Sequence, residues 1–476
     1  MTDTQQNTAI AAWEHDPFAA VLEGPPTLNQ PVQRSLPNLD PPGLPVGIAG
    51  PRPAPEIFSV GTDGFRYWAL ADALARAAGY WSGRVPTGTT WQPENGTRLM
   101  AHPDDGVNLN AFYNRNGLHF FHGSVRGTTV FSAESPDVVC HEFGHAVLDA
   151  VKPELFDAAS IEVAAFHESF GDCSAILSNL QLPSLREEVL ADTEGRVVTA
   201  SRLSRLAESL GWAIRQLIPD AVSSDCLRSA VNSFYYQAPA SLPPQAPAAS
   251  LSSEPHNFSR VFTAGFFRML GLMFGLQPQH NSEGLRKAAE DAGTLLIRGV
   301  RISPVVPEFY AQVAANMVAA DTQLFGGKYH MPIIRGFVSA GVLSVQAAAL
   351  LGSEDQLAEA PALTAQNGGG ELPRVSLPGT SYRLPNDLFV RAASQPTRFG
   401  VASGTPDIGE TQPPAPDQAA SSFVVDLVRR GRIAAREEDV GDAPIIPGQF
   451  TTHEIRAAAG ALELRRTRFD CGFGLH

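Results

Sequence analysis

The sequence predicts an α+β protein because two stretches of the chain show different periodicities. Residues 98–132 contain short apolar and β-branched runs separated by Asp, Asn and Gly, the pattern of strands joined by turns. Between residues 136 and about 345, apolar residues recur at helical spacing. The expected helices are 136–150, 160–180, 202–218, 257–275, 283–298, 307–323 and 330–341. Strands and helices therefore occupy separate stretches, as in α+β folds.

The flanking segments complete a division into four parts. With 476 residues and 43% hydrophobic composition, the chain is long enough for two to three domains. Residues 1–55 are rich in proline and turn formers, which predicts an extended or disordered arm. A helix over about 65–80 then opens an N-terminal lobe, 56–185, which a helical C-terminal lobe, 186–350, follows. Residues 351–476 are expected to form a linker and a small β-containing module of unknown role, with strands in "SFVVDLVRRGRIAAR" and "ALELRRTRF".

Composition excludes several classes of partner. The net charge of −14 argues against nucleic acids and anionic membranes, and no apolar run is long enough to cross a bilayer. The first residues have neither a basic start nor an apolar core, so we expect synthesis in the cytoplasm, with any export by another route. Four cysteines do not make a disulfide framework, and we expect Cys140 and Cys173 to be small buried hydrophobes.

The segment "SPDVVCHEFGHAVLDA" predicts a metal-binding helix. Ser135 can cap its N-terminus and Pro136 suits its first turn. His141 and His145 are four residues apart, so both imidazoles leave the same face and can reach one Zn²⁺ at about 2.0–2.1 Å. Glu142 follows the first histidine and is suited to take a proton from a metal-activated water. Taken alone, the pattern also fits a solvated helix face with two satisfied histidines.

The next predicted helix strengthens the metal hypothesis. Glu168 lies in "IEVAAFHESFGDCSAIL", and Asp172 follows it one turn later on the same face. Catalytic zinc commonly has three protein ligands and one open position, and a further carboxylate often accepts the outer N–H of a ligating histidine. The alternative is an exposed acidic pair. The two helices together predict one catalytic Zn²⁺ held by His141, His145 and Glu168.

These motifs resemble those of the thermolysin-like gluzincin metallopeptidases, in which H-E-x-x-H is followed by E-x-x-x-D. The resemblance covers about residues 60–345, and the order and spacing of its motifs agree with the family. The other similar segments are "NAFY" at 110–113, "DCLRS" at 225–229, "PHNFS" around His256 and "YHMPIIRGFVSAGVLS" at 329–344.

The resemblance implies a two-lobed zinc endopeptidase, with the zinc cleft between an α/β lobe and a helical lobe. In this chain it implies zinc ligands, a general base, groups that stabilise the transition state and groups that hold substrate. These are His141, His145 and Glu168 for zinc, Glu142 as base, Asp172 to orient His141, His256 and Arg228 for the oxyanion, Asn110 and Ala111 for the substrate backbone, and Val138 and Leu227 for the pocket after the scissile bond. The alternatives are an ordinary salt bridge for Arg228 and a helix-start histidine for His256.

The sequence departs from the family at three places. Phe156 stands where the family has a tyrosine that donates to the oxyanion, unless it packs in the turn between the zinc helices. The acidic partner expected five residues before His256 is Leu251, which leaves Glu254 as an open replacement. The family's calcium-binding acids have no convincing match, so calcium is not predicted. The long prosegment of secreted members has no counterpart either, since some 60 residues precede the similar region.

The sequence thus predicts a zinc endopeptidase acting on a peptide or protein substrate. Two alternatives stay open: an aminopeptidase-type gluzincin, although no "GxMEN"-like segment is found, and a delivered toxin or interaction protein with a weak zinc site. An unrestricted protease would threaten its own cytoplasm. We therefore expect narrow specificity, a regulatory partner or delivery, with the arm or the module over 351–476 involved.

Overall fold

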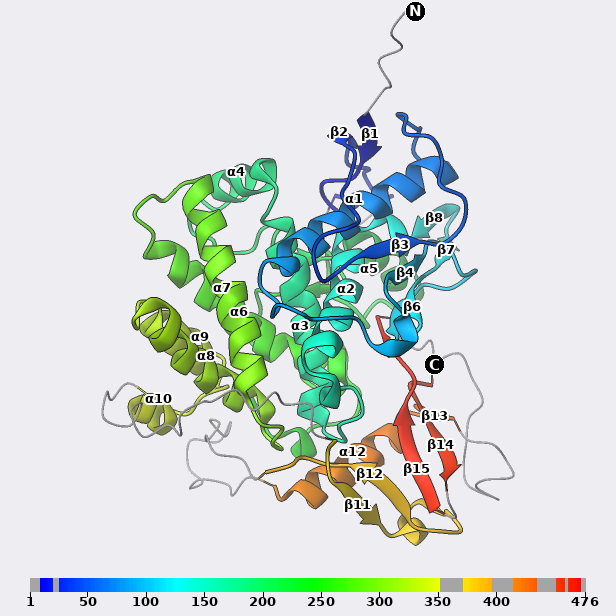
Figure 1. The fold of residues 1–476 in the computed structure, drawn as a ribbon, viewed down its shortest axis with the longest axis vertical. Helices are drawn as coiled ribbons and strands as arrows, with labels where there is room; N and C mark the ends of the chain where they lie inside the picture. Colours follow the sequence, from blue (N-terminus) through cyan, green and yellow to red (C-terminus); the bar gives the residue numbers. More distant parts are fainter. Residues whose placement is uncertain are drawn as a thin grey trace, which may run out of the picture.

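The computed structural model describes residues 9–19, 25–351, 371–395, 414–434, 451–458 and 461–471. It confirms the mixed α+β class. Figure 1 shows the helices packed together beside a sheet, with a second sheet below. The helices are α1 (Asp63–Ser82), α2 (Pro136–Val151), α3 (Ile161–Asn179), α4 (Pro183–Asp192), α5 (Glu208–Leu217), α6 (Pro255–Gly275), α7 (Ser282–Ile302), α8 (Phe309–Phe325), α9 (His330–Ser339), α10 (Val345–Leu351) and α12 (Pro416–Arg429). None of the described helices is long and apolar enough to cross a membrane.

The first sheet has five strands in the order β16-β5-β6-β4-β3. Its strands are β3 (Val46–Ile48), β4 (Leu99–His102), β5 (Ala111–Asn114), β6 (Gly117–Phe120) and β16 (Phe469–Asp470). β3, β4 and β6 pair in parallel, whereas β5 pairs antiparallel with β6 and with β16. The hairpin of β7 (His122–Val125) and β8 (Thr128–Phe131) follows. The strands predicted over 98–132 are thus confirmed.

The N-terminal arm is extended where it is described, but it packs on the rest of the fold. β1 (Ala9–Ala12) pairs with β2 (Val32–Ser35), and β3 joins the first sheet. The Trp13 ring is buried and meets the Phe65 ring of α1 edge-on at 5.3 Å. The arm cannot bury a core of its own, and its buried residues join the core of neighbouring elements instead. The sequence analysis did not predict this packing.

The zinc-motif helices form as their caps predict, and glycines let them approach. The Ser135 and Ser160 side chains accept hydrogen bonds from the third residues of α2 and α3. A Cβ atom added to Gly144 would lie 2.7 Å from the Ser174 side chain, and one added to Gly171 would lie 2.6 Å from the His141 ring. Glycine at both positions therefore permits the close packing of α2 on α3 that brings the motifs together.

Two helix predictions need correction. The helix expected over 202–218 begins only at Glu208, because Ala207 has a positive φ of 55° and β9 (Arg205–Leu206) precedes it, paired with β10 (Arg228–Ser229). Helix α4 was not predicted, since its sequence "PSLREEVLAD" buries only three side chains and has a weak apolar pattern.

Residues 371–471 contain a second sheet, ordered β11-β12-β15-β14-β13, with α12 packed on it. Its strands are β11 (Arg374–Leu377), β12 (Leu388–Arg391), β13 (Ile433–Ala434), β14 (His453–Ala458) and β15 (Ala461–Arg466). The strand expected in "SFVVDLVRRGRIAAR" is wrong over most of its length, because Phe423, Val424 and Leu427 lie on one face of α12 and pack into this sheet. The strand in "ALELRRTRF" is confirmed as β15. Much of the predicted linker, 352–370 and 396–413, lies outside the described residues.

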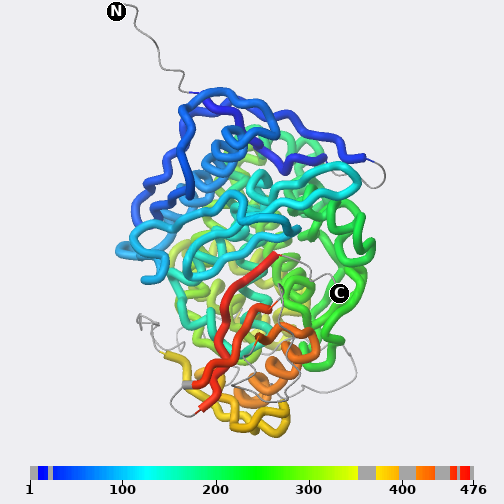
Figure 2. The backbone as a smooth tube through the Cα atoms, turned by 90° about the vertical axis from the view of Figure 1, so that its right-hand side faces the viewer, coloured from blue at the N-terminus to red at the C-terminus, as the bar shows by residue number. Residues whose placement is uncertain are grey.

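This second sheet unit, called the module below, packs against the start of α3. Ala159, Ile161 and Ala164 belong to its hydrophobic cluster, and the Ala159 amide donates to the Arg391 carbonyl at 2.7 Å. In Figure 2 the chain continues from the module into the main body as a red segment, which ends beside the first sheet. β15 thereby delivers β16 to the edge of β5, next to the motif helices.

Candidate metal centre

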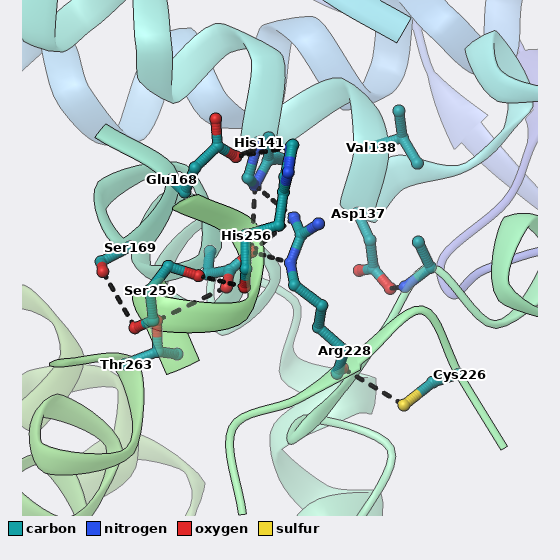
Figure 3. A network of polar contacts seen from close by, with 12 residues as sticks. Asp137, Val138, His141, Glu168, Ser169, Cys226, Arg228, His256, Ser259 and Thr263 are labelled. Atoms are coloured by element: carbon teal, nitrogen blue, oxygen red, sulfur yellow. Dashed lines mark hydrogen bonds and ion pairs between the residues drawn. The ribbon is translucent and has the colours of Figure 1, made fainter. Parts of the chain in front are cut away.

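Helices α2 and α3 bring the three predicted metal ligands together. The potential ligand atoms of His141, His145 and Glu168 all lie within 4.8 Å of one another. His141 Nε2 is 3.3 Å from one Glu168 oxygen, and His145 Nε2 is 3.7 Å from the other. All three side chains are buried. Figure 3 shows Glu168 and His141 turned toward each other beside His256.

The unsatisfied atoms of this group fit a metal ion. Among the described residues, Nε2 of both histidines, one Glu168 oxygen and both Glu142 oxygens are buried without a hydrogen-bond partner. Buried polar atoms are usually paired, so an unpaired set that converges indicates a ligand. Two imidazole nitrogens and a carboxylate oxygen suit zinc. Burial and the positive charges nearby lower the pKa of His145 well below its usual value, which keeps it neutral as ligation requires.

Asp172 and Arg228 form a buried ion pair behind His141. Asp172 lies 3.1 Å from His141 Nδ1, and Arg228 donates to the same carboxylate from Nη2 at 2.9 Å and from Nε at 3.2 Å. Burial would raise the pKa of Asp172, but Arg228 and His141 outweigh it and hold the pKa at about 2. Arg228 thus makes the salt bridge considered as its alternative. Its Nη1 atom, however, is buried and has no hydrogen-bond partner in the described structure.

His256 lies at the start of α6 and completes the polar group. Its Nε2 is 3.3 Å from Glu168, and its Nδ1 is 2.7 Å from the Glu254 carboxylate. Glu254 also caps α6 by accepting from the Asn257 amide. It therefore supplies the acidic partner that the sequence left open. Burial lowers the pKa of His256, but Glu168 and Glu254 outweigh it and raise the pKa to about 9, which favours the protonated ring.

The four residues expected to hold substrate lie on, or next to, elements that adjoin this group. Ala111 is the first residue of β5, and the Asn110 side chain accepts from the Ala111 amide at 2.8 Å. Val138 lies one turn before His141 on α2, and Leu227 directly precedes Arg228. Val138 and Leu227 are buried in the main hydrophobic core.

Phe156 packs among aromatic rings in the turn between α2 and α3. Its ring meets Phe469 edge-on at 5.5 Å and Tyr113 at 6.3 Å, and the Arg115 guanidinium lies 4.2 Å above it. Phe469 in turn stacks on His145 at 5.0 Å between centroids. The Phe469 ring therefore separates Phe156 from His145, the nearest predicted ligand.

Sequence reasoning missed four residues of the site. His167 directly precedes Glu168, and its Nδ1 lies 3.4 Å from His145 Nδ1, so the motif itself was a signal for it. The other three are Phe469, Asp470 and Cys471, for which no local pattern points to the site. The Cys471 sulfur lies within 4.8 Å of potential ligand atoms of His141 and Glu142. Burial and Glu142 raise the pKa of this thiol to about 12.

Neither a protein-family profile nor a curated protein matches this sequence. The chemistry of the site therefore carries the argument about function.

Proposed function

We propose that this protein is a zinc-dependent endopeptidase with a thermolysin-like arrangement of two lobes around its metal site. The observation that carries the proposal is the convergence of His141, His145 and Glu168, whose ligand atoms are buried and lack hydrogen-bond partners, beside a Glu142 carboxylate that is equally unpaired. This is the set of groups that metal-assisted hydrolysis of a peptide bond requires.

The ligand set would hold one zinc ion, which when bound would polarise the scissile carbonyl and acidify a water molecule. Glu142 is the base that takes the proton. Burial raises its pKa to about 7, so the carboxyl group can accept a proton and then release it to the leaving amine near neutral pH.

His256 and Arg228 are placed to stabilise the negative charge that develops on the carbonyl oxygen. His256 lies beside the ligand Glu168, and its Nε2 atom can donate a hydrogen bond. Arg228 is fixed by Asp172 through two of its nitrogens, which leaves Nη1 free to donate. Donors held in place before the reaction stabilise the transition state without reorganisation, typically by a few kcal/mol.

The strand β5 is suited to bind the peptide backbone. Among the described residues, its edge opposite β6 pairs with the two residues of β16 and accepts one more hydrogen bond, from the Cys471 amide. Cys471, which follows β16, contacts the Ala111 carbonyl and lies near the predicted ligand His141. A peptide added at this edge would therefore run beside Ala111 and close to the metal ligands. This geometry favours cleavage within a chain, and the lobe that carries β5 and the lobe that carries α6 would form the two walls.

A second candidate function has one observation in its favour. The edge of β5 is already paired and all of the site residues are buried, which suits a zinc-binding interaction protein that hydrolyses nothing. The intact base and ligand set favour the enzyme.

Glu142→Gln tests the proposal. This variant keeps the shape of the side chain but cannot accept a proton, so it should retain zinc and lose turnover on an internally quenched peptide by roughly 10²-fold or more. Glu162→Gln is a matched control, because Glu162 is also a buried acid, on α3, and pairs with Tyr236 and with the Tyr310 amide. Equal turnover in wild type and Glu142→Gln, or turnover that a chelator does not abolish, would refute the proposal.

A further inference from the structure

We infer that Phe469–Cys471 lies on the substrate-binding edge as a built-in inhibitor, with the Cys471 thiolate as a further ligand of the metal. The inhibitory role depends on the proposed peptidase function, whereas the metal–sulfur contact depends only on the metal site. We call residues 469–471 the inhibitory segment.

The backbone of the inhibitory segment follows the path proposed for a substrate. β16 pairs antiparallel with β5, and the Cys471 amide donates to the Ala111 carbonyl at 2.8 Å. His256 Nε2 donates to the Asp470 carbonyl oxygen. The donor proposed to stabilise the reacting carbonyl is therefore engaged by a carbonyl of the chain itself.

The Cys471 side chain lies beside the predicted ligand His141 and the proposed base Glu142. Its sulfur lies within 4.8 Å of ligand atoms of His141 and Glu142. His141 Nε2 and both Glu142 oxygens are buried and without hydrogen-bond partners among the described residues, so they point independently to a bound cation. A cysteine thiolate is a strong zinc ligand. Beside His141 and Glu142, the thiolate would bind the metal in place of the catalytic water.

Formation of the metal–sulfur bond needs no oxidant. A metal–sulfur bond forms and the S–H bond breaks, and the proton passes to Glu142, the nearest base. The thiolate would then stand where the metal-activated water has to bind.

Ring stacking and hydrogen bonds hold the inhibitory segment in place. Phe469 stacks on His167 at 3.9 Å and on His145 at 5.0 Å. Just before it, Arg466 donates from Nε to the Phe156 carbonyl at 2.8 Å and from its amide to Asp157 at 3.1 Å. These bonds tie the end of β15 to the turn between the two zinc-motif helices.

The module itself covers the site. A cavity beside Glu168 and His256 is lined on its other side by Phe423 and Thr452 of the module and by Phe469. Because the module is part of the same chain, binding of the inhibitory segment at the site is intramolecular and needs no association step. Movement of the module away from α3 would be needed to admit a substrate.

The test uses the full chain loaded with Co²⁺, which replaces zinc and reports sulfur ligation by a thiolate-to-metal absorption band in the near ultraviolet. Wild type should show the band, and Cys471→Ser should bind one equivalent of cobalt without it. Cys140→Ser is the matched control and should keep the band, because the Cys140 sulfur faces the Ala73 carbonyl at 3.7 Å. A cobalt-loaded wild type without the band overturns the assignment.

Two further measurements separate the possible outcomes. In unmutated protein, metal should protect Cys471 from alkylation, which peptide mapping measures. Equal alkylation with and without metal would overturn the ligand assignment. This measurement does not depend on whether Cys471→Ser folds. Hydrolysis of a quenched peptide should rise in Cys471→Ser and in Phe469→Ala. The inhibitor assignment is wrong if wild type is already fully active and neither variant exceeds it. It is also wrong if wild type is cleaved after Asp470 and Glu142→Gln is not. If no variant hydrolyses peptide yet the band is present, the proposed function fails and the sulfur ligand stands.

Discussion

Removal of the Arg228 guanidinium should destabilise the protein more than an ordinary buried substitution. Arg228 and Asp172 are 4% and 1% exposed, and two nitrogens of Arg228 donate to one Asp172 oxygen at 2.9 and 3.2 Å. In Arg228→Met the Asp172 charge stays buried without its partner. Breaking a buried pair in this way typically costs about 3–5 kcal/mol.

The pKa of Asp172 gives a second measure of the same interaction. It lies at about 2 instead of the ordinary 3.8, a difference that corresponds to about 2–3 kcal/mol of stability. Because the pKa is lower in the folded chain, this stability is present above about pH 4 and is lost as the pH falls from about 4 to 2. Arg228→Met should remove most of this acid sensitivity. Asp172 also orients His141, so we expect zinc affinity to fall about 10–100-fold.

Urea unfolding of Arg228→Met, Asp172→Asn and the double variant measures the coupling directly. Arg260→Met serves as the control, since Arg260 is also buried but donates to a backbone carbonyl, that of Ala248, at 2.7 Å. We expect the coupling between Arg228 and Asp172 to exceed about 1.5 kcal/mol. A coupling below about 0.5 kcal/mol, within the error of additivity, would refute the argument.

The remaining predictions concern single side chains. Wild type should contain about one equivalent of zinc and Glu168→Gln much less, as measured by elemental analysis; full retention would contradict the ligand assignment. Phe156→Tyr should lower stability by about 1–3 kcal/mol without raising turnover, because its ring packs against Phe469; a faster enzyme would restore the oxyanion role. A second buried acidic group consists of Asp16, Asp137 and Glu208, whose oxygens lie within 4.8 Å of one another. Burial and the charge of Asp16 raise the pKa of Asp137 to about 7. Because this pKa is higher in the folded chain, the free energy of unfolding should decline as the pH rises from about 4 to 7. Urea midpoints of Asp137→Asn should change less over that range.

The sequence was most informative where function depends on local spacing. His141 and His145 share a helix face because they are four residues apart, and the caps at Ser135 and Ser160 mark helix starts that the structure confirms. It was less informative where tertiary packing decides. The run "SFVVDLV" has β-branched residues typical of strands, yet α12 forms there because one face packs on a sheet.

Contacts between distant parts of the chain had no signal in the sequence. Cys471 is 330 residues from His141, and tertiary contacts such as the pairing of β16 with β5 bring them together. The partner of His256 was uncertain for a local reason. Glu254 is two residues away instead of five, and it reaches the ring because it is the N-cap of α6, where the chain turns into the helix.

The unpaired atoms of the site imply that metal binding and stability are coupled. Each buried polar atom without a partner costs about 1–3 kcal/mol, and His141, His145, Glu168 and Glu142 all contribute such atoms. Against a typical total stability of about 5–15 kcal/mol, this cost is large. Zinc should therefore raise the melting temperature, by an amount that grows with its concentration relative to the dissociation constant. If Cys471 is a ligand, the rise should be smaller in Cys471→Ser than in Cys140→Ser, because only the first variant loses a bond to the metal. Equal shifts in both variants would mean that the thiol lies beside the site without binding to it.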